Sequence, residues 1–199
     1  MKITQTEKRQ IVKQMLLSIG EDPEREGLTG TPDRVVRMWG EIFKGYDEKQ
    51  LPKVTTFTNG KDGILYDQMI SDTGNFYSHC EHHMVPFFGK YFFAVIYHPK
   101  GKLLGLSKVA RVVDYFSARL QTQERLARDI VNFLWDSVTV NGMEPIAMGV
   151  VLEGSHLCKE MRGVKKKGKM RTTELKGTIK SDISARAEFM DWVNTNGSH

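Results

Sequence analysis

The first apolar positions of the chain recur at helical spacing. Ile11, Met15 and Ile19 follow one another at steps of four. Because residues four apart lie on one face of a helix, this spacing predicts a helix over residues 5–19. Gly20 follows directly and suits the end of a helix.

A second helix is expected from Thr31. Threonine is a good N-cap, and Pro32 fits the first helical turn, where its missing N–H would have no partner. The apolar residues that follow predict one buried face on this helix. That face consists of Val35, Met38, Trp39, Ile42 and Phe43.

Extended segments are expected further along the chain. Residues 51–73 are interpreted as a loop with short extended pieces. From about residue 74 to 98 the aromatic and β-branched content is typical of a strand. Residues 146–153 favour a buried strand, and residues 156–180 are expected to contain two more strands joined by a basic loop.

Two helices separate these extended segments. A short helix is expected to begin near Ser107, and a longer one covers about residues 122–140. In the longer helix Leu126, Ile130 and Leu134 fall on one face. The resulting order of helices and strands predicts an α+β fold with a mainly antiparallel sheet. Its exposed strand edges would be a liability in a monomer, and pairing between subunits is one remedy.

Composition places the chain among globular proteins and adds a positive charge. The formal net charge is +5, and five basic residues gather between Lys165 and Arg171. Such a run is typical of a protein with a polyanionic partner, but an ordinary solvated loop is the favoured interpretation. The start of the chain lacks an apolar signal core, and no apolar run is long enough to cross a bilayer. A soluble, cytoplasmic protein with no membrane partner is therefore expected.

The strongest local chemical signal is Cys80-Glu-His-His83. A cysteine and a histidine three residues apart can bind one metal ion, and thiolate with imidazole selects zinc. Cys158, the only other cysteine, lies two residues after His156. If that segment is a strand, both side chains point to one face and can meet the first cluster. Three protein ligands plus water would make a catalytic zinc site, whereas buried cysteines acting as small apolar groups are the alternative.

Two histidines and one helix start are further candidates. His82 and His156 could move protons near a zinc-bound water, or serve as a fourth ligand or a core histidine. Ser107 is a plausible N-cap, and Lys108 and Arg111 lie on one side of the helix that it opens. This arrangement could hold a phosphate, although many ordinary helices begin in the same way.

These pieces, in this order, resemble GTP cyclohydrolase I over about residues 8–193. The matching stretches are Gly20-Glu-Asp-Pro-Glu-Arg-Glu-Gly-Leu28, Thr31-Pro-Asp-Arg34-Val, Cys80-Glu-His-His83-Met-Val-Pro-Phe, Gly105-Leu-Ser-Lys-Val-Ala-Arg111, Gln121-Thr-Gln-Glu-Arg-Leu126 and His156-Leu-Cys158-Lys-Glu-Met-Arg162-Gly.

The resemblance implies an activity and a cofactor. Members of this family convert GTP and water to formate and 7,8-dihydroneopterin triphosphate, the first step of folate, pterin or deazaguanine biosynthesis. Cys80, His83 and Cys158 would bind Zn²⁺, which activates the water that attacks C8 of guanine. His156 would protonate the imidazole nitrogen, and His82 would assist ring opening.

The resemblance also assigns the remaining site residues. Ser107 is a candidate for the later rearrangement of the ribose, and Gln123 would lie beside the reacting base. Glu124 would hold the guanine edge, because carboxylates accept hydrogen bonds from its N–H groups. The other contacts to substrate, mostly cations matched to the triphosphate, would come from Leu106, Lys108, Arg111, Arg162 and Arg34, the last from a neighbouring subunit.

The family fold is the tunnelling fold, in which subunit sheets join edge to edge into a barrel. The resemblance therefore implies a helical region at 1–50, a tunnelling-fold catalytic domain at 51–199 and a homodecamer with active sites at subunit interfaces.

A nucleic-acid-binding module with a structural zinc is the first alternative, but it needs a fourth ligand and has no base-stacking aromatic pattern near the basic run. Different chemistry on a pterin or deazapurine, the second alternative, is disfavoured because the zinc set and the Ser107–Arg111 set occur together.

Overall fold

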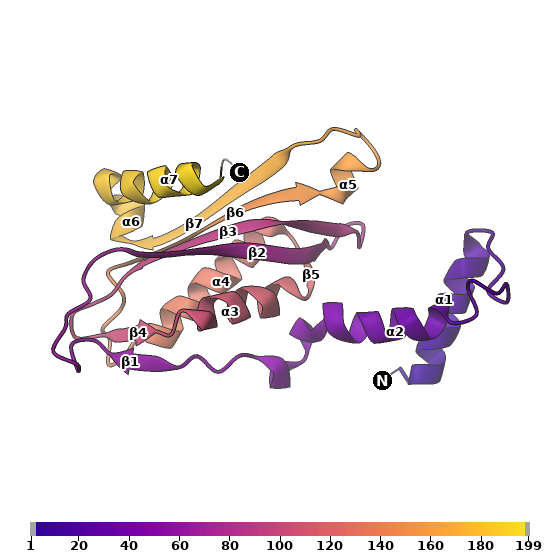
Figure 1. The fold of residues 1–199 in the computed structure, drawn as a ribbon, viewed down its shortest axis with the longest axis horizontal. Helices are drawn as coiled ribbons and strands as arrows, with labels where there is room; N and C mark the ends of the chain where they lie inside the picture. Colours follow the sequence, from indigo (N-terminus) through magenta and orange to yellow (C-terminus); the bar gives the residue numbers. More distant parts are fainter. Residues whose placement is uncertain (1–2, 198–199) are drawn as a thin grey trace.

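A five-stranded sheet lies at the centre of the fold, with helices on both of its faces (Figure 1). The computed structural model describes residues 3–197. Its elements are, in order, α1 (Gln5–Ser18), α2 (Thr31–Ile42), the 3-10 turns η1 (Lys44–Tyr46) and η2 (Glu48–Gln50), β1 (Thr56–Thr58), β2 (Ile70–Cys80), β3 (Pro86–Ile96), β4 (Lys102–Leu104), α3 (Ser107–Ser117), β5 (Leu120–Gln121), α4 (Gln123–Val138), β6 (Ala147–His156), α5 (Leu157–Glu160), β7 (Lys169–Gly177), α6 (Thr178–Ser181) and α7 (Ile183–Gly197).

The sheet has the strand order β5-β2-β3-β6-β7. All of its long strands pair antiparallel, and only the two-residue β5 runs parallel to its neighbour. The expected α+β fold with a mainly antiparallel sheet is confirmed. Within the described residues, the outer edge of β7 has no partner strand, and β2 is paired on its outer side only at His79 and Cys80. Both ends of the sheet therefore present backbone groups that can pair with another strand.

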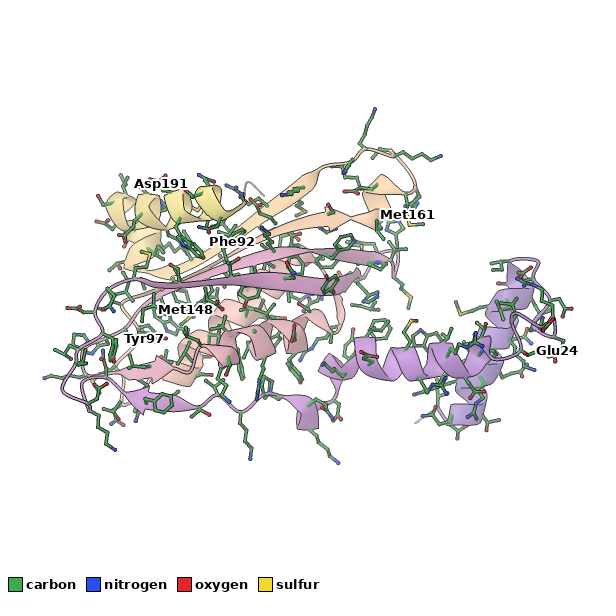
Figure 2. The ribbon with its side chains drawn as sticks, viewed as in Figure 1. Glu24, Phe92, Tyr97, Met148, Met161 and Asp191 are labelled. Atoms are coloured by element: carbon green, nitrogen blue, oxygen red, sulfur yellow. The ribbon has the colours of Figure 1, made fainter. Side chains whose placement is uncertain are left out.

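Alternate residues of the central strands fill two separate cores. On β3, Phe93 and Val95 pack toward α3 and α4, whereas Phe92 and Ala94 pack toward α7. Figure 2 shows Phe92 on the α7 side of the sheet and Met148 of β6 on the opposite side. Successive side chains of a strand point to opposite faces, so a strand buried on both faces is apolar throughout.

The helices α1 and α2 form an arm that extends away from the sheet (Figure 1). The predicted helix over residues 5–19 is confirmed, and a capping box between Thr4 and Glu7 starts it. Its apolar face has little to pack against in the single chain. Ile11, Met15 and Ile19 are exposed by 41%, 54% and 75%.

The second helix is confirmed, but two details of its prediction are wrong. Gly30, not Thr31, is the N-cap, and Thr31 is the first helical residue. The expected buried face is only partly covered, since Met38 is 44% exposed and Val36 is the apolar residue that becomes buried. The reason is the same as for α1: the arm meets the body only at its end, so much of its surface faces solvent.

The expected extended segments differ from the strands observed. The segment 74–98 contains two strands, β2 and β3, joined by a turn, and β2 already begins at Ile70 within the expected loop. The segment 156–180 holds one strand, β7, preceded by the helical turn α5. The sequence interpretation did not include α7, which covers the second core with Phe189 and Val193. In the described part of the chain, no helix combines the length and apolar character needed to span a bilayer.

Candidate metal and nucleotide site

Three side chains converge where β2 ends and α5 begins. The ligand atoms that Cys80, His83 and Cys158 offer all lie within 4.8 Å of one another. Both cysteines are free thiols; Cys80 is buried, Cys158 is half-buried and His83 is exposed. Two thiolates and an imidazole fit a divalent metal of the zinc type, and three ligands leave a tetrahedral position open toward solvent. The group can therefore hold a metal ion.

Strand register brings these ligands together. The turn after β2 is closed by a hydrogen bond from the Met84 amide to the Cys80 carbonyl at 2.7 Å, with Met84 at a φ of 56°. On the next strand Phe87 lies opposite His156. This pairing places the end of β6, and with it Cys158, beside the turn that carries His83.

The expected geometry of Cys158 is wrong in one respect. The strand β6 ends at His156, and Cys158 belongs to the helical turn α5. Period-two alternation therefore does not explain how Cys158 reaches the group. The turn that follows the strand brings its thiol there instead.

His156 lies beside this group in a well-defined setting. Its ring stacks on Phe87 with centroids 4.6 Å apart and an interplanar angle of 7°. Its Nε2 is 2.9 Å from Oε1 of Gln123. Burial lowers the pKa of His156, and the nearby carboxylates of Glu124 and Glu160 oppose that shift. The ring is thus held between an aromatic face and an amide oxygen.

His82 occupies the exposed side of the same turn. Its Nδ1 lies 3.6 Å from the Cys80 thiol, and its ring centroid is 6.5 Å from that of His83. Neither His82 nor His156 belongs to the group of three ligand atoms found among the described residues.

Two arginines contact the metal group (Cys80, His83 and Cys158) or the turn that carries it. Nη1 of Arg162 lies 2.5 Å from Nε2 of His83, so a guanidinium stands at the mouth of the group. Arg125 forms an ion pair with Glu81 and thereby ties the turn after β2 to the first turn of α4. That first helical turn also carries Glu124, which is exposed. The Glu81–Arg125 pair and the Phe87 stack were missed because no local pattern marks contacts made across the fold.

The second expected constellation lies at the other end of α3. Leu106 is the N-cap and makes no side-chain capping bond, so the prediction that Ser107 caps the helix is wrong. Lys108 is half-buried, while Leu106, Ser107 and Arg111 are exposed. The helix has 11 residues, about 16 Å of length, and leads from β4 toward β5, which pairs beside the metal turn (Figure 1). A single chain therefore does not bring this constellation to the metal group.

The remaining predicted residues lie at separate places in the fold. Arg34 lies exposed on α2, in the arm. The basic run is exposed at 165–167, but Arg171 is engaged elsewhere, donating from Nε to Glu153 Oε1 at 2.7 Å. On the exposed side of α4, Arg128 Nε approaches Glu174 Oε2 at 4.0 Å.

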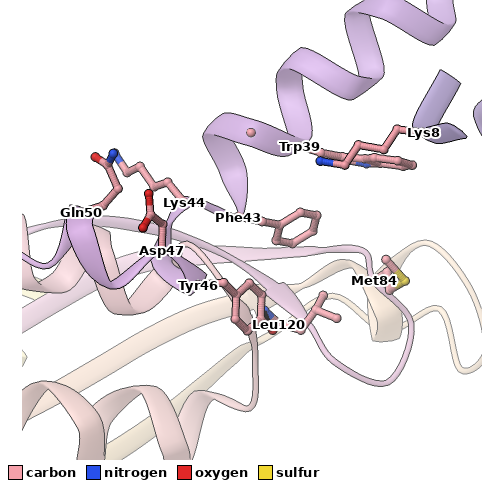
Figure 3. A pocket seen from close by; sticks show the side chains of 10 residues that line it. Lys8, Trp39, Phe43, Lys44, Tyr46, Asp47, Gln50, Met84 and Leu120 are labelled. Carbon is pink, nitrogen blue, oxygen red and sulfur yellow. Dashed lines mark hydrogen bonds between the residues drawn. The ribbon is translucent and has the colours of Figure 1, made fainter. Parts of the chain in front are cut away.

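A cavity of about 720 Å³ lies between the arm and the body (Figure 3). Trp39 and Phe43 of the arm contribute aromatic walls, and Met84, next to His83 in the chain, closes one side. The sequence interpretation assigned nothing to this cavity, since it forms between segments far apart in the chain.

Comparison with known proteins identifies the family. The model of the GTP cyclohydrolase I family matches residues 8–194. The chain belongs to the GTP cyclohydrolase I family. Among its relatives, the GTP cyclohydrolase 1 of Acetivibrio thermocellus is 45% identical over 187 residues, covering 92% of this chain and 94% of the relative.

Other relatives agree with this assignment. The GTP cyclohydrolase 1 of Caldanaerobacter subterraneus subsp. tengcongensis is 44% identical, covering 94% of this chain and 95% of the relative. That of Sinorhizobium fredii is 42% identical, with coverage of 94% and 88%. A solved structure described as the archaeosine synthase QueF-Like in the apo form is 13% identical to this chain, with a TM-score of 0.39. The match covers 53% of this chain and 92% of that chain, and the likeness is too low to indicate a shared function.

Membership of the GTP cyclohydrolase I family confirms the resemblance drawn from the six sequence stretches. One half of the family's expected site is assembled within the chain, around Cys80, His83 and Cys158. The other half, at the start of α3, stands apart from it.

Proposed function

We propose that this chain hydrolyses and rearranges GTP to 7,8-dihydroneopterin triphosphate and formate in a zinc-dependent reaction. The observation that carries the proposal is the convergence of Cys80, His83 and Cys158 in a chain that the GTP cyclohydrolase I family model matches over residues 8–194. The product would serve folate, pterin or deazaguanine biosynthesis. Free cysteines favour a reducing compartment, and we place the reaction in the cytoplasm.

Zinc is the metal proposed for the site. Two thiolates with one imidazole prefer zinc over magnesium or calcium, which favour oxygen ligands. When bound, zinc lowers the pKa of a water and so supplies a nucleophile for C8 of guanine at neutral pH.

Proton transfer is assigned to the two histidines outside the ligand group. His156, whose pKa burial lowers, can exchange a proton with the imidazole ring of the substrate. His82, exposed on the turn, would assist as the ring opens and the formyl group leaves. Gln123 would lie beside the reacting base, and Ser107 would serve the later rearrangement of the ribose.

Substrate contacts are assigned by charge and position. Glu124 is exposed on the first turn of α4, close enough to affect the pKa of His156, and would accept hydrogen bonds from the guanine edge. Arg162, beside His83, would contact the triphosphate. The other proposed contacts are Leu106, Lys108, Arg111 and Arg34.

Those other contacts support a site shared between subunits. The start of α3 and the outer end of α2, which carries Arg34, lie away from the metal group of their own chain, so a second copy must supply them if they bind the same GTP molecule. The exposed apolar face of α1 and the free edge of β7 offer surfaces for such contacts. We propose a homo-oligomer, a decamer with sheets joined into a barrel as in the tunnelling fold. Native mass spectrometry measures the subunit number, and a monomer under assay conditions would contradict the shared site.

Turnover of GTP tests the function itself. Zinc-loaded protein incubated with GTP is expected to release formate and a product that oxidises to a fluorescent pterin, in equal amounts. ATP is the matched control, because its base lacks the N–H pattern that Glu124 is proposed to read. Protein with stoichiometric zinc that releases no formate from GTP would overturn the proposal.

A further inference from the structure

Gln123 is a buried residue whose hydrogen-bonding capacity is used entirely inside the protein. It is 1% exposed at the first position of α4. Its Nε2 lies 3.0 Å from the carbonyl oxygens of Leu152 and Met170 and 3.0 Å from the Thr172 hydroxyl. An amide nitrogen has two N–H groups, and three acceptors surround them. No N–H of Gln123 remains for a bound ligand.

These contacts fix which way the amide faces. Backbone carbonyls accept hydrogen bonds and cannot donate them, so the nitrogen of Gln123 must face Leu152 and Met170. The amide oxygen therefore faces His156, where Oε1 lies 2.9 Å from the ring Nε2. An amide oxygen only accepts, so Nε2 of His156 must carry the hydrogen and donate it. In the neutral ring, the lone pair then resides on Nδ1.

The surroundings hold the ring and the amide in this arrangement. Phe87 stacks on the face of His156 at 4.6 Å and opposes tilting of the ring. Gly154 leaves room for the amide oxygen, since a Cβ at that position would lie 2.6 Å from Oε1 of Gln123. The contact depends on three elements at once: α4 supplies Gln123, β6 supplies His156 and β3 supplies Phe87.

We propose that Gln123 is a positioning residue that holds His156 in the Nε2–H tautomer, so that Nδ1 is the nitrogen that exchanges a proton with the substrate. Gln123 acts through His156 and makes no hydrogen bond to the guanine base beside it, because its amide is already bonded within the protein. This inference rests on the proposed function, in which His156 is the acid–base group. It deepens that function by naming the reacting atom.

The kinetic test compares two buried glutamines. Gln123→Met, in the zinc-loaded enzyme, is expected to lower kcat for GTP by about 10- to 100-fold, the usual cost of losing an orienting partner, with little change in KM. Gln121→Met is the matched control. Gln121 is 2% exposed, and within residues 3–197 its amide donates to Phe116 O and Asp129, so its loss affects packing without touching His156. A raised KM with unchanged kcat in Gln123→Met would mean that Gln123 contacts substrate, and would overturn the inference.

Nitrogen NMR of histidine-labelled protein provides a readout that does not depend on turnover. The chain has six histidines, and the His156 signals are assigned by their loss in His156→Asn. At a pH where the ring is neutral, wild-type His156 is expected to be protonated at Nε2 and unprotonated at Nδ1. Gln123→Met is expected to populate the other tautomer. A wild-type ring protonated at Nδ1 would overturn the inference whatever the variants do.

A second variant tests the same contact in case Gln123→Met does not fold. Gly154→Ala keeps the Gln123 side chain but forces its oxygen away from His156, because the added Cβ would lie 2.6 Å from Oε1 and only 3.2 Å from the Phe76 ring. It is expected to reproduce both the lower kcat and the mixed tautomer. Failure of the proposed function is distinguishable, because it would appear as absent GTP turnover in wild type while the tautomer of His156 stays measurable.

Discussion

Cys158→Ala is expected to lose bound zinc and GTP turnover together. Cys158 supplies one of only two thiols in the group, and its ligand atom lies within 4.8 Å of those of Cys80 and His83. Two remaining ligands make a weak site. Zinc affinity should fall by more than the 10- to 100-fold that removal of an outer-shell partner causes. The zinc content of purified protein and the rate of formate release measure both effects on one sample.

Met161→Ala is the matched control for this loss. Met161 follows directly after α5 and is 61% exposed, so its truncation perturbs the same segment without removing a ligand. It is expected to keep one zinc per chain and near-wild-type turnover. A Cys158→Ala protein that retains stoichiometric zinc would show that the metal, if bound, uses other donors.

His156→Ala is expected to separate metal binding from chemistry. The ring lies beside the metal group but outside it, stacked on Phe87 and bonded to Gln123. Its removal should leave the zinc content unchanged and lower kcat by about 10²- to 10⁴-fold, the usual contribution of a general acid or base. Zinc analysis and formate release again provide the two measurements.

His98→Ala controls for loss of a histidine as such. His98 lies in the turn between β3 and β4, where its Nδ1 accepts a hydrogen bond from the Lys100 amide. Both zinc content and turnover should remain close to wild type. If His156→Ala loses the metal, the division between ligands and acid–base groups is wrong, and His156 is a ligand.

Local spacing was enough to predict part of this site. A cysteine and a histidine three apart lie in one turn, so Cys80 and His83 could be paired without knowledge of the fold. Cys158 was correctly grouped with them because it is the only other cysteine, but its position in a helical turn was not foreseen. The location of Cys158 beside Cys80 and His83 depends on the pairing of β3 with β6. The sequence pattern of a single segment does not contain this long-range register.

The fold class was also predictable from local patterns, whereas the burial of individual helix faces was harder to predict. Periodicity identified α1 and α4, since an amphipathic pattern is a property of one segment. It also suggested that Met38 would be buried, yet a helix face becomes buried only where another element covers it. The roles assigned to Ser107, Lys108, Arg111 and Arg34 stay predictions, because in one chain they lie apart from the metal group.

If subunits share active sites as proposed, the separation of the start of α3 from the metal group has a genetic consequence. A chain with a defective metal half still lends an intact α3 start to its neighbour, and a chain with a defective α3 start still lends an intact metal half. Two inactive alleles damaged in opposite halves would therefore complement each other within a mixed oligomer. Two alleles damaged in the same half would not.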